Sequence, residues 1–215
     1  MDAFIQEMKN VRPEFEVWEK RKEDPRIGYQ EIKFHMTFDI KLGENFRRKA
    51  RLVRCRHTTT APASITYSSI VSRNPFRIAL AISALNGLEI LACDIQNAYL
   101  TAKCREIIWT TAEPEFDLEE GSIMVLKMAL YGLKSSGAAF RSKLASLLHG
   151  IRYTPSKADP DVWMRPVIKS DGTKYYKYDL VYVDYVLLIS CTPTKTIEGI
   201  KCVFRASLYV PGKIT

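Results

Sequence analysis

The sequence has no long apolar run and no secretion signal. No stretch approaches the roughly 18 consecutive apolar residues that a membrane-spanning helix needs, and residues 1–7 lack the basic start and apolar centre of a signal peptide. These absences predict an intracellular protein, cytoplasmic or nuclear, that does not contact a membrane.

Cysteine is scarce, and its spacing matches no known framework. The five cysteines are odd in number and include no C-x-x-C pair, which excludes a disulfide framework and a zinc module. His57 follows Cys55 closely, but no second ligand pair comes at finger spacing, so no metal is expected there. Reduced thiols are predicted at Cys55, Cys93, Cys104, Cys191 and Cys202.

Acidic residues are outnumbered by basic ones. The 215 residues include 32 Lys plus Arg against 24 Asp plus Glu, a net charge of +8, with a pI near 9.2. This balance favours a polyanionic partner such as nucleic acid. The 47% hydrophobic content suffices for one large or two small folded domains.

The first half of the chain predicts a leader, a hairpin and a helix. Residues 1 to about 30 are rich in charge and are expected to form a helix or linker outside the core. Residues 34–40 and 47–53, with a turn at 43–45, predict a basic antiparallel hairpin, followed by a polar loop over 57–69. Pro75 opens a helix from Phe76 to Leu85, and Asn86-Gly87 ends it.

The second half alternates strands and helices. A buried strand over 88–93 leads to Asp94 and then to a short helical or irregular stretch ending at Leu100. Further strands are predicted at 123–130, 161–168 and 175–183, the last two joined by a turn at 170–172. A loop at 132–134 precedes a helix over 135–148, with Ser135 or Ser136 as its N-cap.

Two carboxylates stand at the ends of apolar strands. The runs 178–183 and 186–190 are separated only by Asp184-Tyr185, which is poor turn chemistry. Asp184 is either a solvent-facing turn residue or a functional group, and such local rule-breaking is common at functional sites. Together with Asp94 it could converge on divalent cations, of which Mg²⁺ fits hard oxygen ligands best. Such a pair suits phosphoryl transfer.

Five segments, in order, resemble copia-type retrotransposon reverse transcriptases, the RNA-dependent DNA polymerase domain of a Gag-Pol-like polyprotein. The segments are residues 28–32, 48–53, 94–100, 129–134 and 182–184. The resemblance covers roughly residues 28–205 and implies an α+β right-hand polymerase whose antiparallel sheet packs on helices. It implies fingers at about 28–85 and a palm at about 86–205 with interleaved fingers segments, after a leader over 1–27 and before a truncated end over 206–215.

The resemblance also implies the chemistry of the hairpin at Tyr182, Val183, Asp184 and Tyr185. Asp94 and Asp184 become metal ligands, with the Ile95 carbonyl oxygen as a third. Two Mg²⁺ ions are implied, with Mn²⁺ as an alternative. The implied partners are an RNA template, a DNA or RNA primer and deoxynucleoside triphosphates.

A second implied group binds the nucleotide. Lys49 and Arg51 would contact the triphosphate, a role suited to a point charge and a bidentate fork. Tyr99 matches the aromatic position that crowds the sugar 2′-carbon and so disfavours ribonucleotides. Lys134 and Ser135 open a segment near template and nucleotide, although family members often carry Gln in place of Ser135.

Three departures from the family pattern predict a truncated, partly degenerate copy. Tyr185 replaces the usual second aspartate and cannot supply an anionic ligand at neutral pH. Residues 54–56 replace small residues and glycine, and the sequence ends at Thr215, before the family's thumb, ribonuclease H and integrase. Three readings follow: an active polymerase, an impaired fold that at most binds nucleic acid, or an unrelated basic α+β protein with Asp94 and Asp184 far apart.

Overall fold

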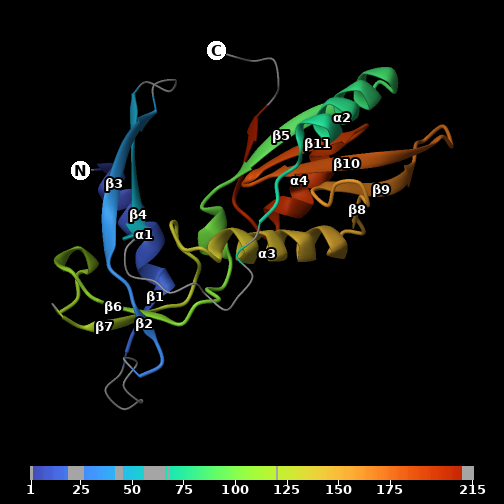
Figure 1. Cartoon of the computed structure of the whole chain (residues 1–215). Helices are drawn as coiled ribbons and strands as arrows, with labels where there is room; N and C mark the ends of the chain where they lie inside the picture. Colours follow the sequence, from blue (N-terminus) through green and yellow to red (C-terminus); the bar gives the residue numbers. More distant parts are fainter. Residues whose placement is uncertain are drawn as a thin grey trace. The chain divides into compact units, whose positions relative to one another are not determined.

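The computed structural model describes residues 2–18, 27–41, 46–55, 66, 68–119 and 121–209. The chain forms two compact units (Figure 1). Unit 1 comprises residues 1–67 and 99–140, and unit 2 comprises residues 68–98 and 141–215. Neither unit is continuous in sequence, so each depends on contacts between segments far apart in the chain.

Unit 1 contains a small sheet in the order β1-β7-β6-β2, in which all neighbours are antiparallel except the parallel pair β2 and β6. Helix α1 precedes the sheet in sequence, and three 3-10 turns lie in the connections. The elements are α1 (Asp2–Val11), η1 (Arg12–Glu14), β1 (Phe15–Val17), β2 (Gln30–Glu31), η2 (Ala98–Thr101), β6 (Ile108–Thr111), η3 (Pro114–Phe116) and β7 (Ile123–Leu126).

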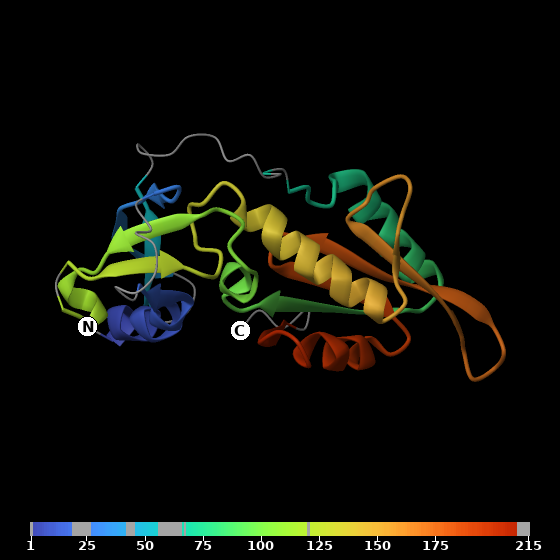
Figure 2. The ribbon, with the colours of Figure 1, turned by 90° about the horizontal axis from the view of Figure 1, so that it is seen from below.

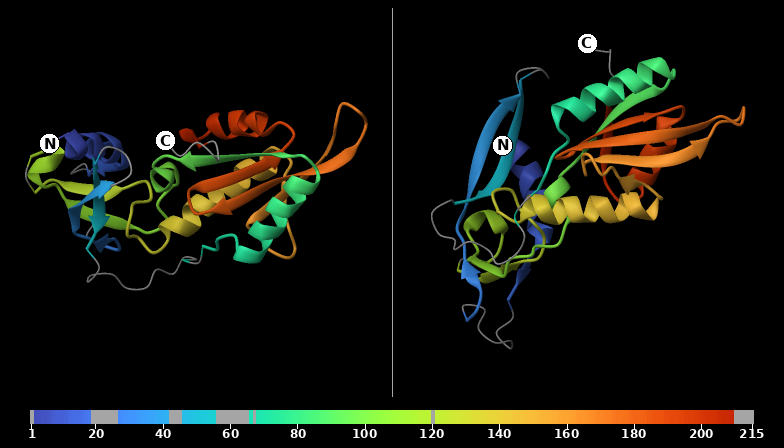
Figure 3. Two further views of the ribbon diagram at one scale, coloured as in Figure 1. Left: turned by 90° about the horizontal axis from the view of Figure 1, so that it is seen from above. Right: turned by 45° about the vertical axis from the view of Figure 1, so that its right-hand side comes forward.

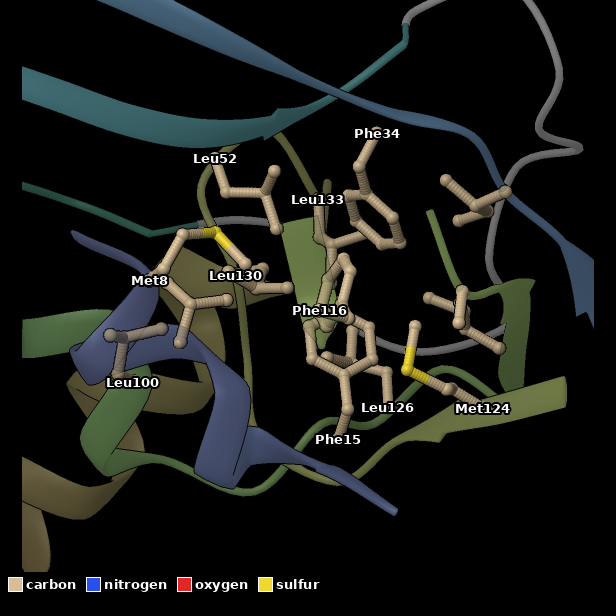
Figure 4. Packing of buried hydrophobic residues seen from close by; sticks show 14 residues of the cluster. Met8, Phe15, Phe34, Leu52, Leu100, Phe116, Met124, Leu126, Leu130 and Leu133 are labelled. Carbon is tan, nitrogen blue, oxygen red and sulfur yellow. The ribbon is translucent and has the colours of Figure 1, made fainter. Parts of the chain in front are cut away.

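The core of unit 1 is aromatic at its centre (Figure 4). The Phe15 ring meets the rings of Phe34 and Phe116 edge to face, with centroids 5.5 and 5.2 Å apart. Met8 and Val11 of α1 are also fully buried. The prediction that residues 1 to about 30 lie outside the core is therefore wrong for α1 and β1, because a few apolar residues at helical spacing suffice to bury one face.

The predicted basic hairpin is confirmed as β3 (Phe34–Lys41) paired with β4 (Arg47–Arg54). Its base is buried, with Leu52 only 6% exposed, whereas Phe38, Ile40 and Phe46 toward its far end are exposed. The predicted turn at 43–45 and nearly all of the loop over 57–69 lie outside the described residues.

Unit 2 is built on a six-stranded sheet in the order β12-β5-β11-β10-β9-β8, with every neighbouring pair antiparallel. β10 and β11 form a hairpin in its interior. The elements are α2 (Arg73–Leu85), β5 (Glu89–Ile95), α3 (Ser136–Gly150, with its first turn in unit 1), β8 (Thr154–Pro155), β9 (Val162–Ile168), β10 (Lys174–Tyr182), β11 (Tyr185–Ser190), α4 (Pro193–Lys201) and β12 (Ala206–Tyr209).

Helices cover both faces of this sheet. α2 lies on one face, where its Ala79 packs with Leu180 and Ile189, and α3 lies on the other (Figures 2 and 3). α4 shares the α3 face, since the hydroxyl of Tyr153, just after α3, lies 3.1 Å from the Thr196 hydroxyl. The predicted architecture of antiparallel sheet on helices is thus confirmed at this level.

Several boundaries differ from prediction. α2 begins at Arg73, with Ser72 at the N-cap position, because its first turn precedes Pro75. The predicted strand over 123–130 ends at Leu126. β6, β12 and α4 were not predicted. In the part of the chain that the structure describes, no helix is long and apolar enough to cross a membrane.

Candidate active site

The β10–β11 hairpin turns through a loop of two residues. Tyr182 and Tyr185 form its last cross-strand pair, so the loop is Val183-Asp184. The predicted loop, Asp184-Tyr185, is wrong by one residue. Val183 takes a positive φ of 55°, which suits tight hairpin turns but is strained for a β-branched residue. The turn therefore positions Asp184 at the cost of backbone strain at Val183.

Strand β5 brings Asp94 beside this loop. Asp94 is the direct cross-strand partner of Tyr185, and the Ile95 amide donates a 2.8 Å hydrogen bond to the Asp184 carbonyl oxygen. The pairing of β5 with β11 thus brings the two predicted aspartates to neighbouring backbone positions in unit 2, although they are 90 positions apart in sequence. Asp94 and Asp184 are both half-buried.

The same register defines what Tyr185 replaces. Side chains of directly opposed residues in an antiparallel pair share a face, with Cβ atoms roughly 5 Å apart. A carboxylate at position 185 would therefore lie beside Asp94, whereas the Tyr185 side chain, 46% exposed, presents a phenol there. The residue that was predicted to depart from the family pattern is thus the cross-strand neighbour of Asp94, the first predicted metal ligand.

The donor set fits a hard cation only in part. Asp94 and Asp184 have carboxylate oxygens, which are ligands of the type that Mg²⁺ prefers. Within the described ranges, no three His, Cys, Asp or Glu side chains gather as a metal site. The presence of two carboxylates here, and not three, agrees with the prediction that Tyr185 replaces an aspartate.

A fully buried carboxyl supports the hairpin from the α3 and α4 side. Asp179 of β10 is 1% exposed, and burial raises its pKa well above 3.8, opposed by a hydrogen bond from Tyr153 and the charges of Lys177 and Arg165. A carboxyl enclosed in this way packs inside the unit and is not placed to serve as a metal ligand. Sequence alone did not reveal it, because β10 reads as an ordinary strand.

Three of the predicted nucleotide-binding residues lie in or beside an aromatic cluster of unit 1. The Arg51 guanidinium lies 5.7 Å from the centroid of the Tyr131 ring, within cation–π range. The Tyr131 and Tyr99 rings are 5.2 Å apart, and Tyr99 also meets Phe140 at 6.3 Å. Lys49, on the same face of β4 as Arg51, is opposite Asp39 of β3.

The base of this cationic strand is tied to α1. The Leu52 amide donates a 3.1 Å hydrogen bond to the Glu7 carboxylate. Burial raises the Glu7 pKa above 4.5, while this hydrogen bond and the charges of Lys49 and Arg51 oppose the shift. Glu7 was missed by sequence reasoning because α1 was assigned to a leader.

The loop before α3 separates the last two predicted residues. Lys134 is exposed. Ser135 is 1% exposed, and both its amide and its hydroxyl donate to one oxygen of Glu106, at 3.1 and 2.5 Å. Ser135 stands at the N-cap position that was predicted, but its side chain bonds Glu106. This partner lies 29 positions away, beyond local sequence signals.

Gly132 holds this loop against β4. Its φ is +89°, and a Cβ there would approach Val53 Cγ1 to 3.0 Å and the Arg54 amide nitrogen to 3.2 Å. Only glycine combines this conformation with this close approach. The loop carrying Lys134 is therefore fixed to the strand carrying Arg51.

Comparisons with known proteins agree with this geometry. The family model described as reverse transcriptase (RNA-dependent DNA polymerase) matches residues 15–210. The chain is 28% identical to the retrovirus-related Pol polyprotein from transposon RE1 of Arabidopsis thaliana over 152 residues, 69% of this chain and 10% of that protein. It is 26% identical to the corresponding polyprotein from transposon TNT 1-94 of Nicotiana tabacum over 125 residues, 57% of this chain and 9% of that protein. The chain thus spans about a tenth of these relatives.

Proposed function

The chain belongs to the reverse-transcriptase family of RNA-dependent DNA polymerases, and on that premise we propose that it carries the polymerase site of a copia-type retrotransposon. The proposed reaction transfers nucleotides from deoxynucleoside triphosphates to a DNA or RNA primer on an RNA template. The observation that supports it most is the pairing of β5 with β11, which juxtaposes Asp94 with the Asp184 loop.

In this proposal Asp94, Asp184 and the Ile95 carbonyl oxygen hold the divalent cations. When bound, Mg²⁺ would neutralise charge on the transferring phosphoryl group and lower the pKa of the attacking primer hydroxyl. The contribution of the protein is positional. The Ile95 to Asp184 hydrogen bond and the strained Val183 fix where Asp184 stands.

Unit 1 supplies the nucleotide contacts in the same proposal. Lys49, Arg51 and Lys134 carry positive charge suited to a triphosphate, and Arg51 is oriented by the Tyr131 ring. Tyr99 sits in the same aromatic cluster and would limit the room for a 2′-hydroxyl. Ser135 would act indirectly, by holding Glu106 under the loop.

Primer extension tests this function. Purified chain is incubated with a primed RNA template and deoxynucleotides, first with Mg²⁺ and then with Mn²⁺. Extension is expected, and Asp94→Asn should abolish it, whereas Asp171→Asn, which removes an exposed carboxylate from a turn of the same unit, should not. Extension that survives Asp94→Asn would refute the assignment of the site.

A second candidate function is nucleic-acid binding by a catalytically impaired polymerase fold. Tyr185 favours it, because a carboxylate is missing beside Asp94. This candidate predicts that the wild-type chain shifts a primer–template duplex in a gel but does not extend it with either metal. Extension by the wild-type chain would exclude it.

A further inference from the structure

Arg54, the last residue of β4, is a buried cation, and two of its three guanidinium nitrogens have no hydrogen-bond partner in the part of the chain that the structure describes. It is 4% exposed, and its Nε and Nη1 atoms are buried with no hydrogen-bond partner. Its backbone, in contrast, is satisfied, since the Arg54 amide donates to the Tyr131 carbonyl oxygen at 3.3 Å. The missing hydrogen bonds of Arg54 are therefore those of its side chain.

An unmatched guanidinium is costly in a protein interior. Arginine is not deprotonated in proteins, so Arg54 cannot escape the cost by becoming neutral as a lysine would. Native structures pair buried charges with an opposite charge or a bound ion. Such an orphaned group therefore points to an anion that binds there.

The strand that carries Arg54 is cationic. Residues 46–55 include five basic side chains and no acidic one. The Nε atom of Arg51 is likewise buried without a hydrogen-bond partner, although Arg51 lies on the opposite face of β4 from Arg54. Both arginines adjoin the loop before α3, Arg51 through the Tyr131 ring and Arg54 through Gly132, whose ideal Cβ would lie 3.4 Å from the Arg54 Cβ.

We propose that Arg54 binds a phosphate oxyanion, making it a phosphate-contact residue of unit 1 beyond those predicted from sequence. A guanidinium fork matches phosphate oxygens in charge and geometry. The choice of phosphate rests on the proposed function, under which it comes from either the nucleotide or the nucleic-acid backbone. Anion binding by Arg54 itself does not depend on catalysis.

The first test is stability in phosphate-free buffer. Arg54→Met removes the charge and keeps an unbranched apolar side chain of moderate length. Because the empty site holds an unpaired buried charge, this variant should unfold at the same or a higher temperature than the wild type. A clear fall in unfolding temperature would overturn the proposal, since it would mean that the guanidinium is a structural group already satisfied by the protein.

The second test is binding without metal, so that turnover is not required. Inorganic pyrophosphate should raise the unfolding temperature of the wild type and of Arg48→Met, which removes an exposed charge from the same strand, but not that of Arg54→Met. Arg54→Lys should keep part of the effect. Equal responses of Arg48→Met and Arg54→Met would refute the site.

Two further ligands distinguish the source of the phosphate. Arg54→Met should weaken either a deoxynucleoside triphosphate or a single-stranded RNA oligonucleotide by about tenfold or more relative to Arg48→Met. Weaker binding of the triphosphate would show that Arg54 contacts the nucleotide. Weaker binding of the oligonucleotide would show that it contacts the nucleic-acid backbone. No selective loss for either overturns the proposal. If Arg54→Met loses affinity selectively but the wild-type chain does not extend a primer, the Arg54 site is supported and the polymerase proposal fails.

Discussion

The two principal hairpins of the molecule differ in charge and are held in opposite ways, since β3–β4 is basic whereas residues 174–190 of β10–β11 carry two lysines and two aspartates. β10–β11 is flanked by β9 and β5, so both of its edges are paired. Among the described residues, β3 and β4 form a sheet of two strands, which is fastened at its base by Glu7 and the Gly132 loop. A carboxylate that shares a cation must be placed closely, whereas a cationic strand that meets a phosphate tolerates movement. The support given to each hairpin matches its proposed task.

The largest expected difference between the hairpins is in hydrogen exchange. Backbone amides of β10 and β11 should exchange about a thousandfold more slowly than those of the far half of β3–β4, because opening a central strand breaks two ladders. Exchange followed by mass spectrometry or NMR measures this ratio. Equal protection of the two hairpins would remove the contrast.

Tyr185→Asp tests whether the β10–β11 hairpin lacks only one catalytic group. It places a carboxylate opposite Asp94 and should raise primer extension by about a hundredfold, close to 3 kcal/mol of transition-state stabilisation. Tyr182→Asp, which adds the same charge to the other side of the loop, is the control. No gain in Tyr185→Asp would show that other parts of the site are also incompetent.

Gly132→Ala tests the fastening of the basic hairpin. The added Cβ meets Val53 and the Arg54 backbone at a positive φ, so unfolding free energy should fall by about 3 kcal/mol. Gly172→Ala has a similar φ but open space around its Cβ, and should cost only about 1 kcal/mol. Urea unfolding of both variants gives the comparison, and similar losses would mean that the close approach is unimportant.

Val183→Asn tests the backbone strain in the β10–β11 hairpin. Asparagine tolerates a positive φ better than valine, so the variant should be more stable by about 1 kcal/mol. Val183→Ala keeps an ordinary side chain in the same conformation and should change stability less. Destabilisation by Asn in thermal unfolding would argue against strain at this turn.

The smallest expected effect concerns pH and Glu7. Because its pKa is raised above 4.5 in the folded protein, the native state retains a proton that the unfolded chain releases. This contribution to stability is complete below 4.5 and is lost as pH rises through the raised pKa. Glu7→Gln should flatten that part of the curve of unfolding free energy against pH. An unchanged slope would show that Glu7 does not titrate in this way.

Local patterns in the sequence predicted what lies within single elements. Alternation along β3, β4 and β10 predicted the strands, and Asp94 and Asp184 stood out because they follow apolar runs. Pairing was beyond such patterns, since β5 meets β11 across 90 positions. The loop was misplaced by one residue because valine is disfavoured at positive φ, and the strand pairing overrides that preference.

The candidate site was predicted unevenly for the same reason. Arg51 and Tyr99 fall in recognisable segments, but their link through Tyr131 is a tertiary contact. Ser135 was predicted from its position, whereas its bond to Glu106 joins distant segments. α1 was assigned outside the core because residues 1 to about 30, in which it lies, are rich in charge of both signs.

The hydrogen bond from Ile95 to Asp184 joins two backbone groups, so it is indifferent to which side chains stand at 184 and 185. Substitutions at positions 184 and 185 can therefore change the chemistry of this hairpin without changing its backbone shape. The genetic code makes such a change reversible, because aspartate and tyrosine codons differ only in their first base. A single base change could thus restore or remove a carboxylate opposite Asp94 while the backbone pairing of β5 with β11 stays as it is.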